Sequence, residues 1–271
     1  MKTRRAFTPT ELMFSIGILV LLISILLPSL ARARELSKRT VCSSNLRGIG
    51  QACYIYAQEG DLFPVLAESR SDGAVTYWAY RKKRPPADAP PSPTADLWML
   101  VRSNNTTPKQ FMCPSTIDVP DPAQDTLAYF DFASGVNLSY AYQYMHNEKR
   151  PAIGPMDDPT LPLLADANPY IKGGIRARPA SDRKSAARGN SANHTDREGQ
   201  NILFVDGHVD FLKAPDAGVS GTSEVPAPSG PRYRDNIYTV HRKGEAVDPG
   251  TTDGFPNRLD LGDASDSCLV P

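Results

Sequence analysis

Two histidines and two aspartates near residue 200 have the side-chain types that could perform acid–base chemistry or bind a metal: His194, Asp196, Asp206 and His208. A metal site needs three or four ligands that converge with fixed geometry. Asp206 is expected in a tight turn and His208 in the strand after it, so their spacing does not predict such convergence. No Ser/His/Asp set, phosphate-binding loop or pair of catalytic carboxylates stands out either. We therefore expect no enzymatic activity, no cofactor and no metal site.

The four cysteines offer a second kind of chemistry, but their spacing gives it little support. No two of them have the close spacing that is typical of a zinc site. A disulfide is permitted if the domain lies outside the cytoplasm, and the sequence leaves its connectivity open. Two cysteines lie on an apolar helical stripe, which favours small buried hydrophobic residues. The third precedes a proline with no second cysteine nearby, which favours a structural role over a redox role. The four are Cys42, Cys53, Cys113 and Cys268.

The charge balance limits the partners that the chain can be expected to bind. The 271 residues carry a formal net charge of zero, which gives no indication of a nucleic-acid partner. The basic run at 81–84 is interpreted as a solvated loop. Asp248, Asp253 and Asp263 could hold calcium, but their spacing matches no known calcium-binding loop, so calcium binding in the C-terminal region stays open.

Glu11 lies at the edge of a long apolar segment. From Leu12 to Ala31 the chain carries no charge. About 20 residues at about 1.5 Å each span about 30 Å, which is the thickness of a bilayer core. Such a segment has to be helical in lipid, because its backbone polar groups need internal partners. It is longer than the core of a signal peptide, and an amphipathic segment follows it without a break. The simplest role for Glu11 is a carboxylate at the positive end of the helix dipole.

The residues before this segment resemble the class III leader of type IV pilins and type II secretion pseudopilins. They read Arg5-Ala6-Phe7-Thr8-Pro9-Thr10-Glu11, with Ala6 where the family usually has glycine. The resemblance implies cleavage between Ala6 and Phe7 by a prepilin peptidase, a membrane aspartyl enzyme that also methylates the new amino terminus. It also implies that Glu11 is the acidic residue used for docking between subunits.

The helix is expected to continue beyond the apolar segment. Residues 31–58 contain no proline and many good helix formers, so one helix of about 50 residues is predicted, bent at Pro28 and ended by Gly60-Asp61. Apolar residues recur there at spacings of three and four, which predicts that one face packs on a downstream element. This apolar stripe consists of Cys42, Leu46, Ile49, Cys53 and Tyr56.

A hairpin is predicted within residues 201–212. Asp206-Gly207 separates two apolar runs, which is the strongest short-range hairpin signal and is typical of a type I′ turn. Strand alternation places Ile202 and Phe204 on one face and Leu203 and Val205 on the other.

The same segment resembles the His-x-Asp-Gly motif that accompanies prepilin leaders in many planctomycete-type bacterial proteins. The spacer between the histidine and Asp-Gly is longer here than in the usual form of the motif. The matching residues are His194, Gly199, Asn201, Phe204, Asp206, Gly207, His208 and Val209.

These elements predict an α+β fold in which a long N-terminal helix packs on a small antiparallel β-sheet. The two resemblances imply that this fold is pilin-like. The expected organisation is a leader peptide (1–6), a transmembrane helix (7–31), its amphipathic continuation (32–59), a globular domain (60–214) and a loop-rich C-terminal extension (215–271).

The resemblance implies a structural subunit of a type II secretion pseudopilus or a type IV pilus-like filament. Its partners would be prepilin peptidase, other pseudopilins and the assembly platform of the inner membrane, with no nucleic acid. The chain would cross the cytoplasmic membrane once, with its soluble domain in the periplasm. The alternative is a membrane-anchored periplasmic ligand-binding module, for which aromatic residues at 128–144 could line a groove.

Overall fold

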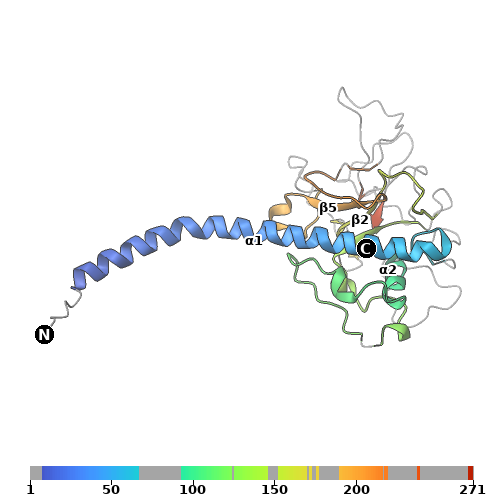
Figure 1. Ribbon diagram of the computed structural model, residues 1–271, viewed down its shortest axis with the longest axis horizontal. Coiled ribbons are helices and arrows are strands. Elements are labelled where there is room, and N and C mark those ends of the chain that lie inside the picture. Colours follow the sequence, from blue (N-terminus) through green and yellow to red (C-terminus); the bar gives the residue numbers. More distant parts are fainter. Residues whose placement is uncertain are drawn as a thin grey trace, which may run out of the picture.

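One helix, α1 (Pro9–Gly60), forms the N-terminal part of the protein (Figure 1). The computed structural model describes residues 8–66, 93–123, 125–145, 152–169, 171–172, 175–176, 189–215, 217–218, 237–238 and 268–270. α1 begins at a capping box in which Thr8 and Glu11 each accept a backbone N–H from the other. It ends at Asp61, whose backbone is left-handed (φ 57°) and whose N–H donates to Ala57. The helix of about 50 residues predicted from the sequence is confirmed.

The two halves of α1 have opposite surroundings. Every large apolar side chain from Leu12 to Leu30 is between 47% and 76% exposed. This half extends away from the globular domain and continues through Pro28 with a gentle curve, as Figure 1 shows. The second half lies against the globular domain through the predicted apolar stripe. Of the stripe, Cys42, Leu46, Ile49 and Cys53 are buried, and Tyr56 is half-buried against the core.

Beneath the second half of α1, the described residues form one antiparallel sheet with strand order β6–β5–β2–β1–β7. Its strands are β1 (Tyr140–Gln143), β2 (Pro162–Asp166), β5 (Gln200–Phe204), β6 (Val209–Leu212) and β7 (Leu269–Val270). β7 belongs to the 215–271 segment, so part of the expected C-terminal extension lies in the sheet of the globular domain. The predicted α+β class is confirmed.

The remaining described elements are short. They are α2 (Pro93–Arg102), the 3₁₀ helices η2 (Pro108–Phe111), η3 (Thr126–Ala128), η4 (Gly135–Asn137) and η6 (Thr195–Arg197), and the strands β3 (Ile171–Lys172) and β4 (Ile175–Arg176). β3 and β4 pair with each other in a separate two-stranded sheet. α2 contributes Trp98 to the main core, where its ring packs edge-on against Phe132.

The two faces of the sheet bury different sets of side chains. Leu203 and Val205 join the core beneath α1. Ile202 and Phe204 pack on the opposite face, together with Ile237, Tyr238 and Leu269 from the C-terminal part of the chain. The alternation predicted for β5 is confirmed.

A close approach of backbone to side chain joins α1 to β5. A Cβ atom on Gly50 would lie 2.8 Å from Cδ2 of Leu203, so this helix position has no room for a side chain unless Leu203 moves. One turn further on, the Tyr54 hydroxyl donates a hydrogen bond to the carbonyl of Val205. These contacts set how close the helix lies to the middle of the sheet.

The predicted hairpin forms, but its turn is not the expected type I′. That turn requires positive φ at both central residues, and only Gly207 has it (φ 87°). Gly207 N–H donates to the Phe204 carbonyl, and Phe204 N–H donates to His208. This pattern is a three-residue loop in which a left-handed glycine follows a tight turn. The loop is one residue longer than expected because Val205 leaves the strand ladder.

Candidate functional site

The residues of the predicted cleavage and docking region are only partly described. Ala6 and Phe7 lie outside the described residues, so cleavage and methylation stay predictions. Glu11 lies in the exposed first turn of α1. Its carboxylate accepts hydrogen bonds from the Thr8 N–H (2.9 Å) and the Thr8 hydroxyl (2.8 Å). Glu11 therefore caps the helix, whatever else it does.

Within the part of the chain that the structure describes, α1 is the helix that is long and apolar enough to cross a membrane. The apolar window lies near its N-terminal end, and none of it is buried within the protein. This agrees with the predicted membrane-spanning segment in length and composition.

The C-terminal motif divides into two separate places. Asp206 and Gly207 lie in the hairpin loop and His208 directly follows it. Asp206 and His208 are exposed, His208 bonds to Asp206, and its ring stacks on Phe204 with centroids 4.3 Å apart. His194, by contrast, is buried. Asp196, the remaining candidate for metal or acid–base chemistry, is exposed. These four acidic and imidazole side chains therefore do not form one common site.

Gly199 and Asn201 position the buried part of the motif. A Cβ atom on Gly199 would lie 2.3 Å from the backbone oxygen of Leu212, so glycine allows β5 and β6 to start pairing here. Asn201 is buried in β5, and its Nδ2 lies 2.9 Å from Nε2 of His194. The structure thus brings two residues of the predicted motif, His194 and Asn201, into direct contact.

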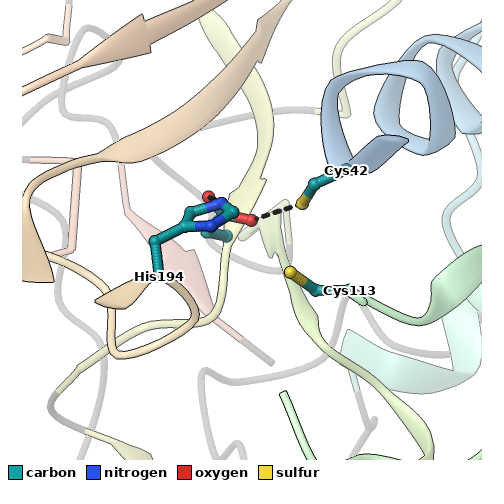
Figure 2. Close-up of side chains that lie close together, drawn as sticks. Cys42, Cys113 and His194 are labelled. Carbon is teal, nitrogen blue, oxygen red and sulfur yellow. Dashed lines mark hydrogen bonds and ion pairs between the residues drawn. The ribbon is translucent and has the colours of Figure 1, made fainter. Parts of the chain in front are cut away.

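Three residues that the sequence did not connect with His194 surround it. The ligand atoms of Cys42, Cys113, Asp166 and His194 all lie within 4.8 Å of one another, and the four residues are buried. We call them the buried cluster. Figure 2 shows the side chains of Cys42, Cys113 and His194 pointing toward a common centre from three different segments of the chain. Cys42 comes from α1 and Asp166 from the end of β2, so the cluster joins the helix to the sheet.

Asp166 is the most heavily hydrogen-bonded member of the buried cluster. Its Oδ1 accepts from the Cys42 thiol (3.0 Å) and from Asn193 Nδ2 (3.1 Å). Its Oδ2 accepts from the backbone N–H of Asn201 (2.7 Å) and lies 3.2 Å from His194 Nε2. A fully buried carboxylate is costly unless it has such partners, and this one has them on both oxygens.

Glu35 holds the other nitrogen of the imidazole. His194 Nδ1 lies 3.0 Å from Oε1 of Glu35, which also accepts a hydrogen bond from the Ser115 hydroxyl (3.1 Å). Burial by itself would lower the pKa of His194. The hydrogen bond and charge of Asp166, with the hydrogen bond of Glu35, raise that pKa to about 9. Each ring nitrogen of His194 therefore lies beside a carboxylate oxygen.

The two thiols differ in their surroundings. Burial raises the pKa of the Cys42 thiol well above its usual value, assisted by its hydrogen bond with Cys113 and by the charge of Asp166. The same hydrogen bond lowers the pKa of Cys113. The Tyr140 hydroxyl lies 3.3 Å from Cys42 Sγ, within hydrogen-bond distance. All four members of the cluster are at most 2% exposed, so they offer no open surface to a substrate.

The buried cluster adds to the sequence-based view of the cysteines. Cys42, Cys53 and Cys113 are all buried in the core, as expected, but Cys42 and Cys113 also lie beside an aspartate and a histidine. The spacing test could not detect this site, because its members come from separate elements rather than from one loop. No local signal marked Cys42, because helical spacing places it in the middle of the apolar stripe, where a buried hydrophobic residue is expected.

The chain was compared with protein-family models, with curated proteins and with solved structures, and none of the three comparisons finds a match.

Proposed function

We propose that this protein is a pilin-like structural subunit without enzymatic activity. In this proposal prepilin peptidase removes residues 1–6, and the mature chain assembles with other pseudopilins at the inner-membrane platform. The product is a type II secretion pseudopilus or a type IV pilus-like filament outside the cytoplasmic membrane. The observation that carries the proposal is one unbroken helix, α1, whose first half is exposed and apolar while its second half packs on the globular domain.

The exposed half of α1 needs an environment that the globular domain does not provide. A run of large apolar side chains on the surface of a soluble monomer is unusual and marks an interaction or membrane surface. Its length, about 30 Å for 20 residues, suits a bilayer core. The same surface suits a bundle of identical helices in a filament core. A subunit that waits in the membrane and then joins a filament uses both environments in turn.

Glu11 adds a reason for assembly. Its described hydrogen bonds are all with Thr8, and none of them supplies a positive charge. A carboxylate at the edge of a membrane helix is costly when it is drawn into lipid without a cation. Cleavage before Phe7 would create a positive amino terminus on the neighbouring subunit. Docking of Glu11 beside that amino group would neutralise both charges within the filament core.

The first test is the intact mass of the mature protein. The full chain, expressed with an active prepilin peptidase, is expected to lose residues 1–6 and to carry one added methyl group on Phe7. The chain expressed with an inactive peptidase should keep Met1 and lack the methyl group. A mature protein that starts after Ala31, or that still starts at Met1 beside the active enzyme, would refute the proposal.

The second test separates the charge of Glu11 from its capping role. Glu11→Gln removes the charge but keeps a side chain that can accept the Thr8 N–H in a capping box. Glu11→Val removes both. If assembly needs the charge, both variants should be depleted from sheared filaments, while membrane insertion stays intact. Glu59→Gln, at the exposed far end of the same helix, is the matched control and should assemble normally.

Two results would oppose this role of Glu11. If Glu11→Gln assembles like the parent and only Glu11→Val is depleted, Glu11 acts as a helix cap. If both variants assemble like the parent, the helix is an anchor alone, and the membrane-anchored binding module becomes the better interpretation.

A further inference from the structure

We propose that the buried cluster of Cys42, Cys113, Asp166 and His194 binds one zinc ion as a closed structural site that fastens α1 to the sheet. This inference does not depend on the filament proposal. It concerns only how the globular domain is held to its helix.

The ligand atoms of the buried cluster are close enough together to bind one ion. In a tetrahedral zinc site, bonds of about 2.0–2.3 Å place neighbouring ligand atoms about 3.3–3.8 Å apart. In this structure the four ligand atoms already lie within 4.8 Å of one another, and His194 Nε2 lies 3.2 Å from Asp166 Oδ2. Side-chain movements of about 1 Å are enough to centre an ion among them.

The donor atoms of the buried cluster are of the types that zinc prefers. Two thiolates, one imidazole and one carboxylate form a set that suits a borderline-soft cation such as zinc, whereas calcium and magnesium require oxygen ligands. All four ligands are supplied by the protein, and all four are buried, so no position is left open for a substrate. This is the arrangement of a structural site rather than a catalytic one.

Hydrogen bonds from neighbouring residues hold the ligands of the buried cluster in place. A histidine that binds a metal through one ring nitrogen normally donates its other N–H to a carboxylate, a backbone carbonyl or water. Glu35 is placed to accept that N–H from His194 Nδ1, at 3.0 Å, which leaves Nε2 beside Asp166 Oδ2 (3.2 Å) and Asn201 Nδ2 (2.9 Å). A zinc ion bound at Nε2 would take the place of the contact with the Asn201 amide. Glu35 is in turn fixed by Ser115 and lies 3.9 Å from Arg39 Nε. Asn193 and the backbone of Asn201 hold Asp166 in the same way.

The test starts from the full chain purified in detergent under thiol-protecting conditions. Elemental analysis should find about one zinc per chain, as expected for a four-ligand structural site. X-ray absorption at the zinc edge should show two sulfur and two nitrogen or oxygen neighbours. Replacement of zinc by Co²⁺ should produce the intense visible d–d bands of a tetrahedral site and, in the near ultraviolet, thiolate-to-Co²⁺ charge-transfer bands.

Matched variants assign the ligands. Cys42→Ala is expected to lose the metal, whereas Cys53→Ala is expected to keep it. Both cysteines are buried on the same stripe of α1, so the two variants remove similar packing. They differ in that Cys42 belongs to the buried cluster and Cys53 does not. Asp166→Asn and His194→Gln should also lose the metal. If a ligand variant fails to fold, the X-ray absorption of the unmodified protein still identifies the ligand set.

Three results would overturn the proposal. One is a protein that contains no zinc and takes none up on dialysis against Zn²⁺ with its thiols reduced. The second is a Cys42–Cys113 disulfide in peptide maps of protein made in the periplasm, because oxidised sulfurs cannot serve as thiolate ligands. The third is equal metal loss in Cys42→Ala and Cys53→Ala.

Discussion

The contact between Gly50 and Leu203 allows a sharp test of how α1 lies on the sheet. Gly50→Ala adds one methyl group to the buried face of the helix, 2.8 Å from Cδ2 of Leu203. Alanine improves helix propensity by about 1 kcal/mol. Overpacking in a filled core costs about 1–3 kcal/mol. The net change in the free energy of unfolding is therefore expected to be a loss of about 0–2 kcal/mol.

The same substitution should have the opposite sign once Leu203 is shortened. Leu203→Ala by itself should cost about 2–5 kcal/mol, because it leaves a cavity beneath the helix. In that background the atoms that collide with the new methyl group are gone. Gly50→Ala should then stabilise the protein by about 1 kcal/mol through helix propensity. The expected coupling energy equals the overpacking cost, about 1–3 kcal/mol.

Urea unfolding of the full chain in detergent, followed by tryptophan fluorescence, gives the free energy of unfolding. It is measured for the parent, Gly50→Ala, Leu203→Ala and the double variant. Trp98 lies in the same core and reports its loss. Gly60→Ala is the control, because a Cβ there meets nothing within 4 Å, and its effect should be equal in both backgrounds. If Gly50→Ala also has equal effects in the two backgrounds, Gly50 and Leu203 are not in contact, and the described packing of α1 on β5 is wrong.

Two further predictions concern the residues around the buried cluster. Glu35→Gln should weaken zinc binding about 10–100-fold in a chelator competition, because it removes the charged partner of His194 Nδ1, and Glu59→Gln should leave the affinity unchanged. An equal zinc affinity in the parent, Glu35→Gln and Glu59→Gln would rule out a supporting role for Glu35. Gly199→Ala should lower the free energy of unfolding by about 1–3 kcal/mol, because its Cβ would lie 2.3 Å from the Leu212 backbone oxygen. Thermal unfolding measures this change. A variant as stable as the parent would contradict the described pairing of β5 with β6.

Local patterns predicted the elements well, for a physical reason. Spacings of three and four placed Leu46 and Ile49 on one helix face, and alternation placed Leu203 and Ile202 on opposite faces of β5. These relations depend only on the geometry of one helix or strand. The type I′ turn at Asp206-Gly207 was wrong because two loop lengths share this sequence signal, and the pairing of Phe204 with His208 decides between them.

The buried cluster could not be predicted from the sequence. Cys42 and Asp166 are 124 residues apart, and their contact exists only because α1 lies over the end of β2. His194 was identified as a motif residue, but nothing in the sequence connected it with Asp166, which lies 3.2 Å from its Nε2. No local period or spacing carries this information, because it depends on the register between β2 and β5 and on the height of the helix above them.

The way α1 joins the globular domain also determines how the protein bears tension. The buried contacts follow the helix from Cys42 to Ala57, a length of about 24 Å at about 1.5 Å per residue. A pull along the helix axis loads all of these contacts at once, in shear. A pull across the axis loads them one after another, as in peeling. The domain therefore resists a force directed along its anchor much better than a force of the same size applied from the side.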